Sequence, residues 1–250
     1  IRMGINVRSI SESRIIEYSR KYDRNWVHMM DNISDEKSSY LLGYILADGC
    51  IRGNSNEVSV TASIVDKDHI SRLASITKSN VRYFTTKRLY NGTERIGSYC
   101  SFSIYSKQLV SSIIDKGIIS NKSHLGCGNV FDYIPDHFIS HFIRGIFDGD
   151  GSICIPNKII HNRYTVSIYN TYEVCKSIFD RVKLYADTLY GGVYKSRGNT
   201  FVVKWSSKDD VSKIGKWLYS DATLYMQRKK DRFDRFTSSN ITLYNEGGNL

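Results

Sequence analysis

The sequence predicts an α+β protein made of two similar halves, each combining helices with antiparallel strands. Three observations lead to this fold class: a segment that occurs twice, a matching order of helical and strand patterns after each copy, and strands in which polar and apolar residues alternate. Of the 250 residues 41% are apolar and 12% are aromatic, so the chain can bury the core that such a fold needs.

The repeated segment occupies residues 40–51 (YLLGYILADGCI) and 142–153 (FIRGIFDGDGSI). Gly43 matches Gly145 and Asp48 matches Asp150, each pair 102 residues apart. We therefore expect the following domains: a short, mostly helical extension at residues 1–37, a first repeat at 38–118, a linker rich in Ser, Asn and Gly at 119–134, and a second repeat with a basic C-terminal tail at 135–250.

Each repeat is expected to contain a helix ending in Asp-Gly, a strand pair, a second helix, a second strand pair and a closing helix. Apolar residues at helical spacing indicate the helices, alternation indicates the strands, and glycine turns at 91–92 and 197–199 stand between strands. After the repeated segments, these patterns lie at residues 57–64, 66–76, 81–90, 99–106 and 107–117 in the first half and at 164–169, 171–185, 192–197, 200–206 and 208–220 in the second.

The alternating strands predict that each sheet has one apolar face for helices and one polar face. The chain carries 35 Lys and Arg against 25 Asp and Glu, a formal charge of +10, which favours a polyanionic partner and nucleic acid first. Cations position phosphates, and hydroxyl, amide and guanidinium groups can recognise base edges in the major groove. An ordinary solvated face would look similar. The candidate DNA-binding residues are Arg52, Asn54, Ser59, Thr61, Ser63, Arg82, Tyr83, Lys87, Arg95, Tyr99, Ser101, Ser103, Arg163, Thr165, Ser167, Tyr169, Tyr194, Lys195, Arg197 and Lys204.

The helices of the repeated segments carry small residues four positions apart, Gly43 with Ala47 and Gly145 with Gly149. This spacing lets two helix backbones approach closely, which would bring Asp48 and Asp150 side by side at their C-terminal ends. Two such carboxylates repel each other unless a cation lies between them, and Mg²⁺ prefers oxygen ligands of this kind. The pattern thus indicates metal-assisted phosphodiester hydrolysis, while the alternative for a single copy is a simple helix C-cap followed by a turn.

The pair LLGYILADG and IRGIFDGDG resembles the signature of the LAGLIDADG homing endonucleases, in their single-chain, two-motif form, over about residues 38–236. The resemblance implies an αββαββα fold in each half, pseudo-twofold symmetry, and motif helices at the interface of two saddle-shaped sheets. It also implies a monomer that binds a long, partly asymmetric site in double-stranded DNA. Mg²⁺, with Mn²⁺ or Ca²⁺ as substitutes, would support cleavage of both strands with short 3′ overhangs.

The resemblance assigns roles to individual positions. It places the metal at Asp48 and Asp150, with Gly49 and Gly151 beside them, whereas the other acidic position of the motif is Leu46 in one copy and Asp148 in the other. The residues implied to organise the hydrolytic water are a basic pair, Lys107 and Lys208, for which Lys204 is an alternative to Lys208, and a polar pair, Asp66 and Asn170.

Other features exclude some classes or leave alternatives open. The five cysteines are odd in number and widely spaced, which supports neither a disulfide framework nor a zinc ribbon. No apolar run reaches about 18 residues, so we expect no membrane partner and a soluble, intracellular protein, in a bacterial or phage-infected cytoplasm or an organelle. The basic cluster Arg228, Lys229, Lys230 and Arg232 would contact phosphates or form a solvated helix face. A catalytically silent DNA-binding regulator and an RNA-binding intron maturase are the alternative functions.

Overall fold

The structure, a computed structural model, describes residues 24–90, 93–119, 127–154 and 164–235. The first half contains η1 (Arg24–His28), α2 (Glu36–Asp48), β1 (Gly49–Arg52), η2 (Gly53–Ser55), β2 (Glu57–Ser63), η3 (Ile64–Asp66), α3 (Lys67–Ile76), β3 (Arg82–Tyr90), β4 (Thr93–Tyr105) and α4 (Lys107–Asp115). The second half contains η4 (Gly128–Tyr133), η5 (Asp136–Phe138), α6 (Ile139–Asp150), β5 (Gly151–Cys154), β6 (Thr165–Asn170), α7 (Tyr172–Tyr185), β7 (Gly192–Lys195), β8 (Phe201–Trp205) and α8 (Lys208–Tyr219).

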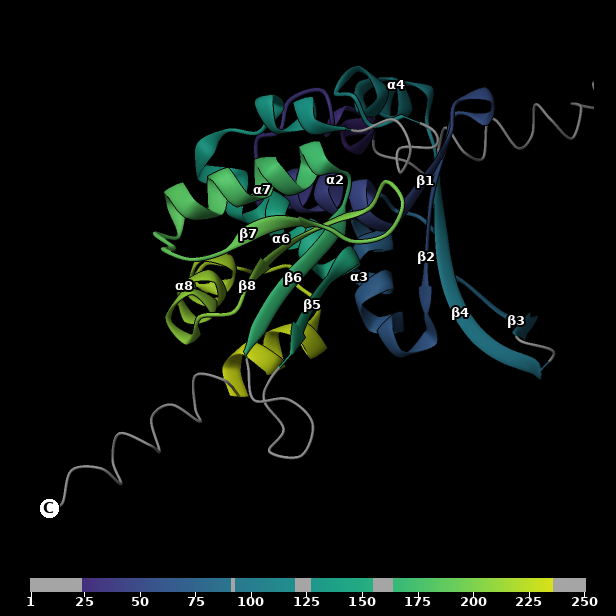
Figure 1. The fold of residues 1–250 in the computed structure, drawn as a ribbon. Helices are drawn as coiled ribbons and strands as arrows, with labels where there is room; N and C mark the ends of the chain where they lie inside the picture. Colours follow the sequence, from purple (N-terminus) through teal and green to yellow (C-terminus); the bar gives the residue numbers. More distant parts are fainter. Residues whose placement is uncertain (1–23, 91–92, 120–126, 155–163, 236–250) are drawn as a thin grey trace, which may run out of the picture.

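The two halves have the same topology. Each forms an antiparallel four-stranded sheet, in the order β1-β2-β4-β3 in the first and β5-β6-β8-β7 in the second. The sheets lie on either side of the molecule, with α2 and α6 between them (Figure 1). The α+β class and the two-repeat architecture are therefore confirmed.

The register of the ladders also corresponds between the halves. Gly49 pairs with Val60, and Val60 with Phe102, while Gly151 pairs with Ile168, and Ile168 with Val203. These four pairings define which residues occupy equivalent positions in the two sheets, and they are used below to compare the two halves.

Among the described elements, α2 and α6 make the most extensive contact, and small residues explain it. A Cβ atom built on Gly43 would lie 2.1 Å from the carbonyl oxygen of Phe142, and one on Gly145 would lie 2.2 Å from that of Tyr40. One on Gly149 would lie 2.4 Å from the Cβ of Ala47. Only glycine permits backbones this close, so the expected packing of the two motif helices is confirmed.

Element boundaries differ from those expected in three places. Asp35 caps α2 by accepting a hydrogen bond from the Ser38 amide, so this helix begins at Glu36, inside the segment assigned to the extension. The linker at 119–134 contains η4, and its residues 120–126 lie outside the described part, as do residues 1–23 of the extension and the turn at 91–92. The strand pair expected after each motif helix is formed by β1 with β2 and by β5 with β6, but the sequence pattern delimits only the second strand of each pair, because four residues are too few for a visible alternation.

A C-terminal segment, residues 220–235, ties the two halves together, and its residues 227–235 are helical. The buried Arg144 of α6 donates to the carbonyl oxygens of Leu218 and Leu224 and, at 2.5 Å, to Glu36 of α2. Farther along, Arg228 donates to both carboxylate oxygens of Asp66, at 2.7 and 3.0 Å. The segment therefore contacts both motif helices and the start of α3.

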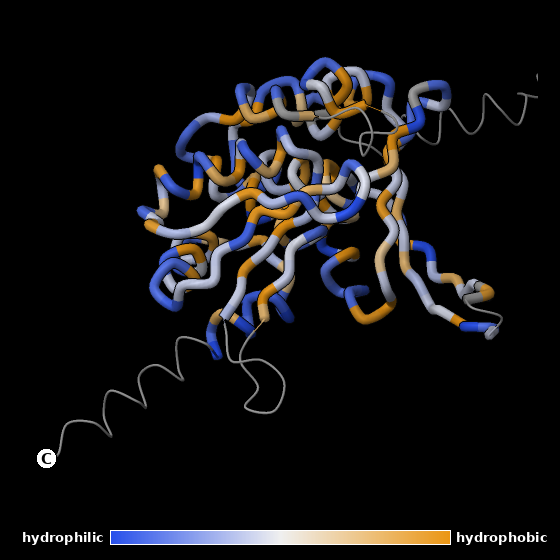
Figure 2. The backbone as a smooth tube through the Cα atoms, in the orientation of Figure 1, coloured by the Kyte–Doolittle hydropathy of each residue, from blue (hydrophilic) through white to orange (hydrophobic). Residues whose placement is uncertain are grey.

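The core is continuous through both halves. Hydrophobic segments gather at the middle of the molecule, and the outer helices alternate between hydrophilic and hydrophobic turns (Figure 2). Of the helices in the described residues, none combines the length and the apolar composition that spanning a membrane requires.

Candidate functional site

Two carboxylates meet where the motif helices end. A Cβ atom on Gly149 of α6 would lie 3.3 Å from Asp48 Oδ2, which places the carboxylate at the end of α2 against the last turn of α6. Asp48 is exposed and Asp150, the last residue of α6, is half-buried. The close helix packing therefore brings the two acidic ends together at the surface, as the motif spacing predicted.

The second sheet completes one side of this acidic site. Asn170, at the end of β6, donates through Nδ2 to Asp150 Oδ2 at 3.3 Å. A hollow of about 260 Å³ opens here between the two halves. Its lining residues are Leu46, Ala47, Asp150, Tyr169, Asn170, Thr171, Asn199 and Thr200.

The first sheet does not repeat this arrangement. Because Val60 and Ile168 are equivalent in register, the counterpart of Asn170 is Ala62. Asp66, which the sequence paired with Asn170, lies three residues beyond the end of β2, is 7% exposed, and is held by the guanidinium of Arg228. The correspondence failed because the loop between the first two strands differs in length in the two halves, so a constant offset does not hold across it.

Lys229, which the sequence placed only in the basic tail cluster, is also a residue of the acidic site. Its ammonium donates to the carbonyl oxygens of Phe147, Asp148 and Gly149 at 2.6, 2.7 and 3.2 Å, so it caps the C-terminus of α6. Burial lowers its pKa to about 8, against the opposing effect of Asp148, Asp48 and Asp150. Lys229 therefore places a positive charge beneath both acidic helix ends.

Asp148 lies inside the protein and not at the surface site. Its carboxylate accepts hydrogen bonds from the hydroxyls of Tyr40 at 2.6 Å and Tyr219 at 3.2 Å, and from the amide of Met226 at 2.8 Å. Burial raises its pKa in spite of these bonds. Leu46, its counterpart, is also buried, which shows that this motif position faces the core in both halves.

The donor set suits a hard divalent cation that keeps part of its water shell. Asp48 and Asp150 supply two carboxylates, and Mg²⁺ is usually bound by one or two carboxylates together with waters and substrate phosphates. Among the described residues no three His, Cys, Asp or Glu side chains gather around one point, so a closed cage of protein ligands is not formed there. Gly49 and Gly151 each follow an acidic residue and donate their amides back to the helix, to Ile45 and Phe147.

Lys107 and Lys208 occupy equivalent positions, as expected, but far from the carboxylates. Each is the first residue of the helix that follows the last strand, and each is exposed. Tyr105, two residues before Lys107, pairs with Glu57. Glu57 in turn pairs with Arg52, at the end of β1 that is remote from Asp48. The register thus argues against a role for either lysine beside Asp48 and Asp150, where Lys229 lies instead.

The first sheet presents a polar face that contains most of the residues expected to contact DNA. Cross-strand partners lie on the same side of a sheet, and the pairs Ser59 with Ser103 and Thr61 with Ser101 fix this side. The other expected residues on it are Arg52, Ser63, Arg82, Arg95 and Tyr99, and Asn54 lies exposed in η2.

Tyr83 and Lys87 are corrections to that expectation. They pair with Cys100 and Ile96 and therefore lie on the opposite side of the sheet, where Lys87 forms an ion pair with Glu94 at 2.9 Å. The alternation of this hairpin is weak in sequence because both sides carry cations and aromatic residues.

The second sheet has an equivalent polar face. It contains Thr165, Ser167, Tyr169, Tyr194 and Lys204. Lys195 pairs with Phe201 and lies on the opposite side, which is a further correction, whereas Arg197 is exposed in the turn between β7 and β8. Arg163 lies outside the described residues.

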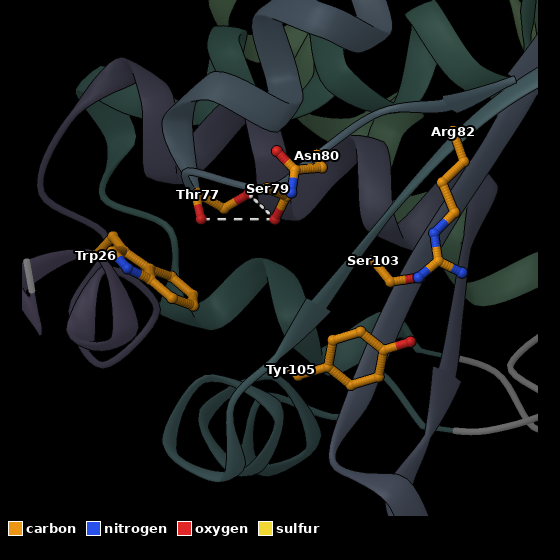
Figure 3. Close-up of a pocket in the computed structure, with 7 residues that line it drawn as sticks. All are labelled: Trp26, Thr77, Ser79, Asn80, Arg82, Ser103 and Tyr105. Carbon is orange, nitrogen blue, oxygen red and sulfur yellow. Dashed lines mark hydrogen bonds between the residues drawn. The ribbon is translucent and has the colours of Figure 1, made fainter. Parts of the chain in front are cut away.

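A small cavity of about 90 Å³ opens where the polar face of the first sheet ends (Figure 3). Ser103, Tyr105 and Arg82 form its sheet side, and Trp26, Thr77, Ser79 and Asn80 close it from the other side. The polar face of the first sheet therefore has a small cavity next to the hydroxyl groups of Ser103 and Tyr105.

Of the tail cluster, Lys229 is buried, whereas Arg228 and Arg232 are exposed and Lys230 is half-buried, although all four have partners within the protein. Lys229 and Arg228 have the partners given above, Lys230 pairs with Asp234 at 2.7 Å, and Arg232 donates to the carbonyl oxygen of Ile153 at 2.9 Å. The two interpretations offered by the sequence, phosphate contact and a solvated helix face, do not apply to the buried Lys229, and for the other three residues the choice between them stays open. Met226, Lys229 and Phe233 stand at helical spacing and are all buried, a signal that Lys229 faces inward.

Comparison with known proteins bears on the fold. No family model and no curated protein sequence matches the chain. Among solved structures, the homing endonuclease I-WcaI bound to its DNA recognition sequence is similar at 14% identity, with a TM-score of 0.59 and coverage of 91% of this chain and 94% of that one.

Two further solved structures are similar over most of their length. The LAGLIDADG homing endonuclease I-GzeII in complex with DNA target has 9% identity, a TM-score of 0.52 and coverage of 85% and 92%. The I-SmaMI LAGLIDADG homing endonuclease bound to cleaved DNA has 15% identity, a TM-score of 0.53 and coverage of 86% and 92%. With two matching sheets, two motif helices packed through glycine and acidic helix ends side by side, this chain has the two-repeat fold of the LAGLIDADG homing endonucleases.

Proposed function

We propose that the chain is a site-specific DNA endonuclease that cuts both strands, with Asp48 and Asp150 at the two cleavage centres. The observation that carries this proposal is the meeting of two acidic helix ends between two polar sheet faces. The fold is shared with endonucleases whose structures contain DNA, which supports a DNA partner for this chain as well.

The two sheets would hold the duplex as a monomer on a long, partly asymmetric site. Arg82 and Lys204 are exposed cations on the two polar faces, suited to phosphates, and the hydroxyls between them are suited to base edges. The net charge of +10 favours association with a polyanion. Cleavage on the two strands would leave short 3′ overhangs.

Mg²⁺ held by Asp48 and Asp150 would polarise the scissile phosphates and make water a stronger nucleophile. The protein's own groups prepare this site. Asn170 orients the Asp150 carboxylate, and Lys229 offsets the negative charge of the carboxylates and of the α6 C-terminus. The helix contact at Gly149 holds the Asp48 carboxylate against α6.

Asp48→Asn and Asp150→Asn test the proposal directly. Two substrates are used, each with Mg²⁺. One is a duplex in which the sequences upstream and downstream of the protein's gene are joined directly, and the other is a randomised duplex library. Each variant is expected to lose double-strand cleavage by more than about 100-fold while binding DNA like the parent, because an amide replaces the charged ligand and keeps its shape. Asp180→Asn, an exposed acid on α7, is the matched control and should cut normally.

A DNA-binding regulator or an RNA maturase would give a different result. Either would bind its nucleic acid and leave the duplex intact with the unmodified chain. Specific binding without any cut, under conditions in which Mg²⁺ is present, would therefore refute the nuclease function and leave the binding role.

A further inference from the structure

A carboxylate lies on the polar face of the first sheet, where a duplex would approach. Glu57 accepts hydrogen bonds from Arg52 Nη1 at 2.9 Å, from the Ser103 hydroxyl at 2.9 Å and from the Tyr105 hydroxyl at 3.2 Å. Burial alone would raise the pKa of Glu57, but the bonds from Arg52 and Ser103 outweigh it and lower that pKa. Glu57 is thus held as a charged carboxylate by three donors.

The hydrogen bond to Glu57 fixes the direction in which the Arg52 guanidinium points. The Arg52 side chain is 59% exposed, whereas that of Glu57 is only 10% exposed. One nitrogen of the guanidinium is engaged by the carboxylate, and the group is planar, so its remaining donors are presented from the sheet as a fork. An exposed arginine ordinarily loses conformational freedom when it binds, and the bond to Glu57 removes part of this cost beforehand.

We propose that Arg52, oriented by Glu57, recognises a guanine in the half-site that the first sheet covers. A forked arginine donating to O6 and N7 of guanine in the major groove is the side-chain contact that best distinguishes this base. This inference rests on the proposed DNA-binding function. It adds a specificity residue, Arg52, and a positioning residue, Glu57, which acts through it.

The position in the half-site follows from the strand. Arg52 lies four residues after Asp48 on β1, or roughly 13 Å at about 3.3 Å per residue. We take β1 to follow the major groove outward from Asp48, so that at about 3.4 Å per base step the guanine lies about four base pairs from the centre of the site.

The second half-site lacks this contact. The register that pairs Arg52 with Glu57 in the first sheet pairs Cys154 with Thr165 in the second. Neither residue presents a guanidinium or a carboxylate, so the contact made by Arg52 has no equivalent at this register of the second sheet and contributes to an asymmetric target.

The test is selection of bound duplexes from a randomised library, with Ca²⁺ in place of Mg²⁺ so that binding is separated from cleavage. The parent chain should enrich a guanine at one position about four base pairs from the centre. Arg52→Ala and Arg52→Lys should lose that enrichment, because lysine keeps the charge and lacks the fork. Glu57→Gln should weaken it, while the preferences in the other half-site stay unchanged.

A chemical substitution isolates the contact. Replacement of the selected guanine by 7-deazaguanine, which lacks the N7 acceptor, should lower the affinity of the parent chain about ten-fold and that of Arg52→Ala hardly at all. If Arg52→Ala instead weakens binding to all sequences equally and reduces the salt dependence, Arg52 contacts a phosphate and the inference is wrong. The inference is also wrong if Arg52→Ala selects the same sequences as the parent chain. A parent chain that enriches no sequence at all would instead overturn the proposed function.

Discussion

His69 is the end of a chain of buried hydrogen bonds beneath the acidic site. Its Nε2 lies 3.1 Å from the Tyr40 hydroxyl, and that hydroxyl donates its only proton to Asp148. Nε2 must therefore carry the proton and donate to Tyr40. Burial lowers the pKa of His69 to about 4, so the imidazole is neutral in the folded protein.

This pKa predicts a pH-dependent stability. The unfolded chain binds a proton at His69 with a pKa of 6.5, above the folded value of about 4. The unfolded state is therefore favoured as the pH falls through this window, and stability that is complete above about pH 6.5 is lost toward pH 4. Denaturant unfolding should show a loss of about 1 to 2 kcal/mol between about pH 7 and pH 5 that His69→Gln no longer shows. His137→Gln, at an exposed histidine, should retain it, and an equal loss in His69→Gln would contradict the assignment.

The sequence predicted the position of a functional residue well where a local motif sets that position, and poorly where tertiary packing or strand register sets it. Asp48 and Asp150 were found because their position is set by a local motif that occurs twice, and glycine packing then brings them together. The place of Lys229 at the acidic site was missed because a lysine within a basic run is ordinarily solvated, and only its apolar neighbours at helical spacing indicate burial. Lys107 and Lys208 occupy equivalent positions in the two halves, as expected. The register of the last strand in each sheet, which the sequence does not reveal, places both lysines away from the acidic site.

The element that determines the site is the pair of motif helices. Gly43 and Gly145 remove two side chains at the points where α2 and α6 touch, and the acidic ends meet only because the helix axes are so close. The elements were predictable from alternation and helical spacing. The different lengths of the loops between the first two strands of each half, which make Ala62 and not Asp66 the counterpart of Asn170, were not predicted. A change in loop length between equivalent strands leaves no trace in a comparison by constant offset.

Gly43→Ala and Gly145→Ala measure this packing. Each methyl carbon would lie 2.1 or 2.2 Å from a backbone carbonyl oxygen, far inside van der Waals contact, so the helices must separate. The loss should be about 1 to 3 kcal/mol of unfolding free energy, in spite of the higher helix propensity of alanine. Gly215→Ala in α8 is the comparison, since its methyl would meet the Phe233 ring, which can shift more easily than backbone. Equal stability of the parent chain and both motif variants would show that the contact is not tight.

At the scale of the whole molecule, the two halves share a topology but not a chemistry. The first sheet carries Arg52 with Glu57, and the second carries Asn170 on Asp150. The C-terminal segment is also unsymmetrical, because Lys229 caps α6 and Arg228 reaches across to Asp66. The pseudosymmetric fold therefore places two acidic helix ends, at Asp48 and Asp150, side by side, and the side chains around them differ.

This inequality predicts that the two DNA strands are cut at different rates. Asn170 donates an amide hydrogen bond to the Asp150 carboxylate, whereas the equivalent position on the first sheet is Ala62 and the Tyr44 phenol lies beside Asp48 instead. Because the two carboxylates are held by different groups, the two centres should cut at different rates, and we expect the centre with the amide, Asp150, to cut first. Groups that orient a metal ligand are typically worth 10- to 100-fold, so Asn170→Ala should slow that strand about ten-fold and lower the peak of nicked plasmid during digestion. End labels on each strand identify the order of cutting. Ala62→Asn, which introduces the amide in the first half, should speed the slower strand or leave it unchanged, but it should not slow the faster one. Equal rates for both strands in the parent chain, or an Asn170→Ala effect shared by both strands, would mean that the centres act alike in spite of their different side chains.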